Sequence, residues 1–263
     1  MALRVNKLMH SVAQRNSRSY SVLHVHFYDY AVPRLLKWIL LEKSRRGHFS
    51  VLDLGCGDGM ILLSLQFQGL LKNVDRVVGV DMSEVRIRRL VENVSGVTGL
   101  VSDACKIEEL DDGSFDVIIC SQLIEHVSND HALLREIRRL LKEDGYVYIS
   151  SVIKKPYGFW LYRRDGQFGL DPTHVREYPS KEAFLLLLEK EGFNPRKVSC
   201  DKLKYSVADL LVRALITIGL YESEGIQTIF PRRRLLTRFR KLLELPVLGY
   251  ERIDVFASLK PNL

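Results

Sequence analysis

The strongest constraint on the fold is a regular alternation of short β-rich runs with longer helical runs, which begins near residue 50. Apolar runs at 50–55, 76–81 and 115–122 are each followed by a segment with helical apolar spacing or by a turn that leads into one. Strands that alternate with helices build a parallel sheet with helices on both faces. The sequence therefore predicts an α/β fold with a doubly wound, Rossmann-like sheet.

Length and composition agree with this class. The chain has 263 residues, of which 46% are hydrophobic and 27% charged, and this suits one α/β domain with insertions. No apolar run reaches the roughly 18 residues that span a bilayer. The four cysteines are scattered without a C-x-x-C pair. This spacing argues against a zinc site or a disulfide framework and indicates a reducing, cytoplasmic location.

Three segments lie outside the alternation and divide the chain. We expect residues 1–49 to form an N-terminal helical cap and residues 50–263 to form the main domain, with inserts at about 152–179 and 201–249. The first twenty residues are rich in Arg and Ser and contain no acid, as in a mitochondrial presequence, but their apolar positions are sparse. The apolar and aromatic content of the inserts suits a roof over a pocket for a partly apolar small molecule.

A glycine-rich turn follows the first predicted strand, in "VLDLGCGDG" at 51–59. Glycines at 55, 57 and 59 allow a sharp turn and a close approach to a ligand. Dinucleotide sites have the spacing G-x-G-x-x-G and place a pyrophosphate at the helix N-terminus. Here the spacing is G-x-G-x-G, and Asp58 would repel a pyrophosphate. A phosphate-binding loop is also excluded, because no Gly-Lys-Ser/Thr follows.

Acidic residues after three successive strands favour a cationic ligand without phosphate. S-adenosyl-L-methionine carries a sulfonium and an ammonium group, and Asp53 can face the ammonium directly or through water. Asp81 ends the second strand, where an acid can accept both ribose hydroxyls. Asp103 can accept from the adenine amino group, while the backbone N–H of Ala104 donates to the ring.

The motifs "VLDLGCGDG", "VVGVDMS", "SDACKIEELDDGSFDVIICSQLIEHV" and "LLKEDGYVYIS" cover roughly residues 50–152. With them the chain resembles the class I S-adenosylmethionine-dependent methyltransferases. The resemblance implies a seven-stranded sheet with an antiparallel last strand. The predicted cofactor-binding residues are Asp53, Gly55, Cys56, Gly57, Gly59, Asp81, Met82, Asp103, Ala104 and Ser121.

Two histidines are candidate general bases, because an imidazole titrates near neutral pH. His126 lies in "LIEHV", and His174 lies in "DPTHVREY", which should cross the mouth of the cofactor pocket. Methyl transfer from a sulfonium is an in-line displacement. Holding the acceptor about 3 Å from the methyl group can supply much of the rate, so the reaction does not require a base.

The stretch "LIEHV" also resembles two metal-assisted families, the ubiquinone-biosynthesis O-methyltransferases and the small-RNA 2′-O-methyltransferases. Both tend to show E-x-x-E-H, in which carboxylates and the histidine hold a divalent cation. This chain has Gln122 at the first position, so one ligand is missing. We therefore predict no metal site, and expect His126 to shape the floor of the substrate pocket through a hydrogen bond.

Missing motifs and local charge bear on the identity of the methyl acceptor. The chain lacks the N/D-P-P-Y/F motif that amino-methylating base methyltransferases often carry, and we expect a small-molecule or lipid-like acceptor at oxygen, nitrogen or carbon. The net charge is +7, and "PRRRLLTRFRK" at 231–241 has no acid. The basic charge of this segment is also consistent with two alternatives, an RNA-modifying methyltransferase and a protein that makes peripheral contact with an anionic membrane. A further alternative is a non-catalytic partner protein that binds the cofactor to stabilise its fold.

Overall fold

The computed structural model describes residues 31–160, 162–164, 167–171, 173–207 and 244–261. The presequence-like N-terminus and the basic segment 231–241 lie outside these ranges, as do most residues of the expected 201–249 insert. No helix in the described ranges has both the length and the apolar character needed to cross a membrane.

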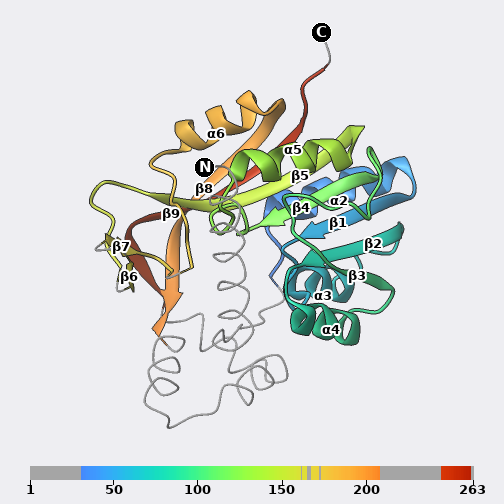
Figure 1. Ribbon diagram of the computed structural model, residues 1–263, viewed down its shortest axis with the longest axis horizontal. Coiled ribbons are helices and arrows are strands. Elements are labelled where there is room, and N and C mark those ends of the chain that lie inside the picture. The colour runs from blue at the N-terminus through green and yellow to red at the C-terminus, as the bar shows by residue number, and fades with distance from the viewer. Residues whose placement is uncertain (1–30, 161, 165–166, 172, 208–243, 262–263) are drawn as a thin grey trace, which may run out of the picture.

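A seven-stranded sheet forms the centre of the molecule (Figure 1). Its strands are β1 (Phe49–Leu54), β2 (Val74–Asp81), β3 (Val97–Val101), β4 (Phe115–Ser121), β5 (Leu141–Lys154), β8 (Phe193–Ser206) and β9 (Glu244–Leu259), in the order β3-β2-β1-β4-β5-β9-β8. Only β9 in this sheet runs antiparallel to its neighbours, β5 and β8. The predicted doubly wound sheet and its antiparallel last strand are confirmed.

Helices cover both faces of the sheet, because successive residues of each central strand are apolar on both sides. Val51 and Val117 face the layer of α2 (Arg34–Arg46), α3 (Met60–Phe67) and α4 (Glu84–Asn93). Leu52 and Ile118 face α5 (Asp130–Leu140) and α6 (Lys181–Lys190). Figure 1 shows α5 and α6 on one side of the sheet and α3 and α4 on the other.

Short polar side chains begin three of the helices. Ser83 and Ser180 accept hydrogen bonds from the backbone N–H groups of Arg86 and Ala183. The helix between β4 and β5 begins after Asn129, whose side chain accepts from the N–H of Ala132. Each cap satisfies an N–H group that the first helical turn leaves without an intrahelical partner.

The run "DHALLREIRRLLKEDG" at 130–145 predicts a helix ended by Gly145, and the structure shows that this prediction is wrong. The helix ends at Leu140, and Leu141 already pairs with Phe115 as the start of β5. The last helical carbonyls, those of Arg139 and Leu140, accept hydrogen bonds from the N–H groups of residues 113 and 114. Strand pairing and the preceding loop therefore end the helix before the glycine does.

The segments outside the alternation contribute to the domain in different ways. Within the expected cap at 1–49, α2 packs Leu36, Ile39 and Leu40 into the core of the sheet. The 152–179 insert contains a small hairpin of β6 (Tyr162–Arg164) and β7 (Gln167–Gly169). Strands β8 and β9 both extend into the range expected for the 201–249 insert, because they pair with each other as far as Ser206 and Glu244.

Candidate functional site

The carboxyl ends of the parallel strands meet at one edge of the sheet. Strand β1 lies between β2 and β4, and Leu54 aligns with Val80 on one side and Cys120 on the other. The chain leaves β1 toward β2 on one side and later returns to β4 on the other. Such a reversal of strand order opens the crevice where α/β sheets bind their ligands.

The glycine turn after β1 has the backbone that only glycine adopts readily. Gly55, Gly57 and Gly59 have φ angles of 68°, 56° and 85°, in the left-handed region. The N–H groups of Gly55 and Cys56 both donate to the carbonyl of Val80, at 2.8 and 3.0 Å. A Cβ atom on Gly55 would lie 2.8 Å from Leu123 Cδ1. The turn is thus held tightly against β2 and against the segment after β4.

Asp58 is not part of the ligand-facing charge. Its side chain is buried, and its two oxygens pair with Arg86 Nε at 3.3 Å and Arg89 Nη1 at 3.6 Å. The interpretation that Asp58 would repel a pyrophosphate is therefore wrong, since two guanidinium groups of α4 balance its charge. Arg86 Nη1 also lies 3.7 Å from Asp81 Oδ2, so the charge argument for a cationic ligand depends on Asp53 instead.

Asp53 is a buried carboxyl group with an unsatisfied oxygen. The residue is 2% exposed, and within the described part of the chain its Oδ2 has no hydrogen-bond partner. Burial, and next the negative charge of Asp81, raise the pKa of Asp53 to about 8. A carboxylate buried without a partner is costly. A ligand ammonium would supply the missing partner, so this position fits the positively charged methionyl end of S-adenosyl-L-methionine.

Asp81 lies at the end of β2, close to the glycine turn. It is only half-buried, and its oxygens accept from the backbone N–H groups of Gly57 at 3.1 Å and Ser83 at 2.9 Å. A carboxylate offers about four acceptor positions, so two such bonds leave acceptor capacity for ribose hydroxyls. Met82 follows it and is also half-buried.

Asp103 and Ala104 begin the loop between β3 and β4. Asp103 is exposed, and its Oδ1 accepts from the N–H of Cys105 at 2.9 Å, whereas Ala104 is buried. Ser121, at the end of β4, has its Oγ 3.1 Å from Ser150 Oγ. The predicted cofactor-binding residues therefore all lie at or just beyond the carboxyl ends of β1 to β4.

The two candidate histidines lie together, although they are far apart in the sequence. The rings of His126 and His174 are edge to face, with centroids 4.7 Å apart. His126 Nδ1 is 3.1 Å from Thr173 Oγ1, and His174 Nδ1 is 3.2 Å from a carboxylate oxygen of Glu177. Each ring is thus oriented through its Nδ1 by a neighbour from the 152–179 insert.

Glu125 completes this cluster and was not among the predicted site residues. It is fully buried, and Ser151 Oγ donates to its Oε2 at 3.0 Å, while Oε1 has no partner among the described residues. Burial raises the pKa of Glu125 to about 7. In the sequence, the adjacent Glu125 and His126 were the only signal for this cluster. Two adjacent letters do not show that the carboxylate is buried.

Glu125, His126 and His174 could together hold a metal ion. One ligand atom from each lies within 4.8 Å of the others. One carboxylate and two imidazoles form a ligand set that divalent transition metals accept in catalytic sites.

Gln122 has a strained backbone. With φ at 52°, it is the one non-glycine residue with positive φ in the described ranges. Its N–H donates to the carbonyl of Ser150 at 3.1 Å, and its amide nitrogen lies 3.4 Å from Ser150 Oγ. Backbone strain of this kind concentrates at functional sites.

Arg176 and Tyr178 form hydrogen bonds with the chain that follows β4. The Arg176 guanidinium donates to the carbonyls of residues 124, 127 and 128, at 3.1, 2.6 and 2.8 Å. The Tyr178 hydroxyl donates to Asp130, and the ring is buried. Arg176 therefore holds the segment that carries Glu125 and His126, and Tyr178 holds the start of α5.

Comparison with known proteins agrees with this geometry. A family model described as a methyltransferase domain matches residues 24–198. Ubiquinone biosynthesis O-methyltransferases from Neisseria meningitidis and Leptothrix cholodnii are 32% and 27% identical over 114 and 155 residues, which is 41% and 56% of this chain. The matches span 46% and 63% of those relatives' own length.

A solved structure of similar fold is the YcgJ protein of Bacillus subtilis. It has a TM-score of 0.58 and 16% identity, and the alignment covers 86% of this chain and 99% of that one. This likeness concerns the fold, whereas the family model also covers the glycine turn, the acidic strand ends and the histidine cluster. The chain belongs to the methyltransferase domain family, and its cofactor is S-adenosyl-L-methionine.

Proposed function

We propose that the protein transfers a methyl group from S-adenosyl-L-methionine to an oxygen of a small-molecule or lipid-like acceptor. The observation that carries this proposal is the buried carboxyl of Asp53 at the switch point of the sheet, whose Oδ2 has no hydrogen-bond partner among the described residues and whose pKa the charge of Asp81 helps to raise. When bound, the cofactor supplies an electrophilic methyl group on a sulfonium. The relatives named as ubiquinone biosynthesis O-methyltransferases support oxygen as the accepting atom.

The cofactor would lie across the carboxyl ends of β1, β2 and β3, with its ammonium group at β1 and its adenine after β3. Asp53 would face the ammonium group, Asp81 would accept from the ribose hydroxyls, and Asp103 with Ala104 would bind the adenine. The remaining proposed contacts come from Gly55, Cys56, Gly57, Gly59, Met82 and Ser121. The close approach of backbone to ligand that the glycine turn permits supports this order.

The acceptor would lie next to the histidine cluster. We assign His126 and His174 as the groups that orient the acceptor hydroxyl and remove its proton. Thr173 and Glu177 contact the Nδ1 atoms, and these contacts orient the two rings. The 152–179 insert supplies His174 and donates from the N–H of Val175 to the carbonyl of Glu125, which supports its role as a roof.

A divalent cation is a second way to activate the acceptor. The cluster of Glu125, His126 and His174 favours it, and a bound cation would lower the pKa of an acceptor hydroxyl. Our prediction of a metal-free site can be tested by activity after treatment with a chelator. Loss of activity that added Mg²⁺, Mn²⁺ or Zn²⁺ restores would contradict that prediction.

The identity of the acceptor class can be tested by transfer of labelled methyl groups into fractionated cell extract. We expect label in the small-molecule or lipid fraction. Label in RNA, with binding to mixed tRNA that weakens steeply as salt rises, would favour the RNA-modifying alternative. Cofactor binding in calorimetry without label in any fraction would favour the non-catalytic partner. We also propose a cytoplasmic location and a peripheral contact with membranes. Binding of the protein to anionic vesicles tests the membrane contact.

A further inference from the structure

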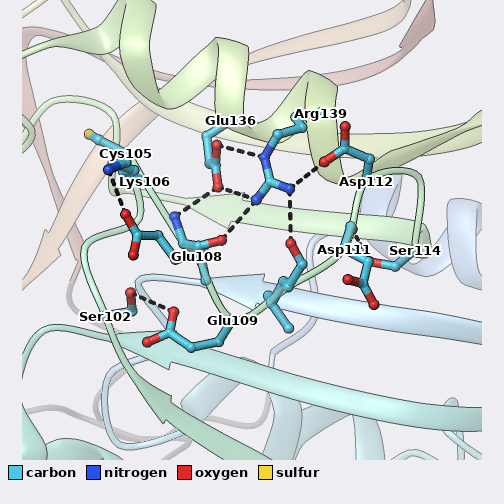
Figure 2. Close-up of polar contacts among 12 residues, drawn as sticks. Ser102, Cys105, Lys106, Glu108, Glu109, Asp111, Asp112, Ser114, Glu136 and Arg139 are labelled. Atoms are coloured by element: carbon cyan, nitrogen blue, oxygen red, sulfur yellow. Dashed lines mark hydrogen bonds and ion pairs between the residues drawn. The ribbon is translucent and has the colours of Figure 1, made fainter.

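The loop between β3 and β4, residues 102–114, is tied to α5 by a network of polar contacts (Figure 2). Two side chains of α5, Glu136 and Arg139, lie at the centre of this network. Glu136 is buried, and Arg139 is partly buried one turn later. The two are paired, with 2.7 Å between Arg139 Nη2 and Glu136 Oε1.

Arg139 binds the far part of the loop at several positions. Its guanidinium donates to the carbonyls of Ile107 at 2.8 Å and Leu110 at 2.9 Å, and it pairs with Asp112 at 2.5 Å. The planar fork of a guanidinium fixes the direction of its hydrogen bonds, which the point charge of a lysine does not. Arg139 therefore determines how the loop backbone is oriented relative to α5.

Glu136 continues a series of hydrogen bonds that begins at Asp103. The N–H of Cys105 donates to the Asp103 side chain, and the N–H of Lys106 donates to the Asp103 carbonyl. The next N–H, that of Ile107, donates to Glu136 Oε1 at 2.8 Å in a buried position. Three successive amides thus connect Asp103 to α5 through one carboxylate.

The ion pair is charged at neutral pH. Burial alone would raise the pKa of Glu136, but the hydrogen bonds from Arg139 and from the Ile107 N–H lower it below its ordinary value. Ile107 and Leu110 are also buried in the core. These apolar contacts are non-directional, so they hold the loop against the domain without fixing the orientation of its amide groups.

We propose that Arg139 and Glu136 are positioning residues that orient the 102–114 loop so that Asp103 and Ala104 bind adenine. This inference rests on the proposed function, because it assumes that the loop receives the adenine ring. Neither residue touches the cofactor in this proposal. Their effect passes through the backbone of residues 105–107.

The test compares Arg139→Met with Arg138→Met in the full chain. Arg138 is exposed on the same helix, and its guanidinium lies beside Gly192. Calorimetry with S-adenosylhomocysteine and S-adenosyl-L-methionine gives Kd, and labelled methyl transfer gives KM and kcat. For Arg139→Met we expect Kd and the cofactor KM to rise about tenfold, equivalent to about 1.4 kcal/mol, with kcat at saturating cofactor within about twofold. Arg138→Met should match the wild type.

Hydrogen exchange provides a second readout. Faster exchange in Arg139→Met should be confined to the amides of residues 105–107 and their loop. If Arg139→Met does not fold, Glu136→Gln replaces it, because glutamine keeps an acceptor for the Ile107 N–H but loses the charge that faces Arg139. The same rise in Kd is then expected.

Three other outcomes would contradict the inference alone or the inference together with the proposed function. A folded variant with Kd within about twofold of the wild type would overturn the inference while leaving the proposed function intact. A fall in kcat with unchanged KM would also overturn it. Failure of the wild-type protein to bind either ligand would overturn the proposed function, and the inference with it.

Discussion

The carboxylate of Asp81 accepts a hydrogen bond from the backbone N–H of Gly57, with 3.1 Å between the two atoms. Its other oxygen accepts from the N–H of Ser83 at the start of α4. One side chain thus joins the end of β2, the glycine turn and a helix N-terminus. The proposed ribose acceptor is held in place before the cofactor arrives, which reduces the entropy that binding must remove.

Asp81→Asn should weaken binding of S-adenosyl-L-methionine by about tenfold or more, because hydrogen bonds to a charged group contribute about 1.5–3 kcal/mol. The amide retains one oxygen, so we expect only a small loss of thermal stability. Calorimetry and a melting curve measure both quantities. Asp75→Asn is the matched control, since Asp75 is exposed on the same strand and pairs with His48. Unchanged affinity in Asp81→Asn would contradict the ribose assignment.

Asp53→Asn should change how stability depends on pH. Because the pKa of Asp53 is raised to about 8 in the folded state, the ligand-free protein holds a proton there that the unfolded chain loses near pH 4. Its stability therefore falls as pH rises between about 4 and 8. The asparagine variant should lack that fall and be more stable at pH 7.5 by about 1–3 kcal/mol, while binding the cofactor more weakly. Urea unfolding at pH 5 and pH 7.5 checks the slope.

Cofactor binding to the wild type should release a proton from Asp53 at pH 7, because a ligand cation favours its ionised form. Calorimetry in two buffers of different ionisation enthalpy measures this release. Asp53→Asn should abolish it. Proton uptake by the wild type would contradict the assignment of a cation at this carboxyl.

Gln122→Gly should relieve backbone strain. A left-handed φ costs a non-glycine residue about 1–2 kcal/mol, part of which the greater freedom of glycine in the unfolded chain offsets. We expect unfolding to become harder by up to about 1 kcal/mol, with unchanged cofactor affinity and slower methyl transfer. Gln122→Asn tolerates the same φ and keeps an amide, so it should retain more activity. Full activity in Gln122→Gly would show that methyl transfer does not depend on the contact of the Gln122 amide with Ser150.

Arg176→Met should destabilise the segment after β4. Its three backbone acceptors, at residues 124, 127 and 128, would lose a charged donor, at a cost of about 2–3 kcal/mol. Methyl transfer should fall more than cofactor affinity, because Glu125 and His126 lie on this segment. Arg135, exposed on α5, gives the control variant Arg135→Met. Wild-type stability in denaturant would show that these hydrogen bonds contribute little.

The order of strands and helices could be predicted from the sequence, because each central strand is buried on both faces and each helix follows a cap or turn. The end of α5 and the length of β8 and β9 could not. Leu141 becomes a strand residue only because Phe115 lies opposite, and β8 and β9 extend only because they pair with each other. Contacts of this kind join residues far apart in the chain, so local propensity does not reveal them.

The acidic strand ends were predictable for a geometric reason. Parallel strands bring their carboxyl ends to one edge, so Asp53, Asp81 and Asp103 had to lie near one another. The roles of Asp58 and Glu125 were not predictable, since each depends on what packs beside it. Asp58 meets two arginines of the following helix, whereas Glu125 is buried under the 152–179 insert.

The position of β9 between β5 and β8 has a consequence for biosynthesis. Residues 244–259 insert between two strands that were made earlier. Until the ribosome has passed this point, β5 and β8 each present an unpaired backbone edge, which is a template for association with other chains. A nascent or truncated polypeptide that stops before residue 244 should therefore aggregate or require a chaperone, even though strands β1 to β4 and the loops that follow them have already been made.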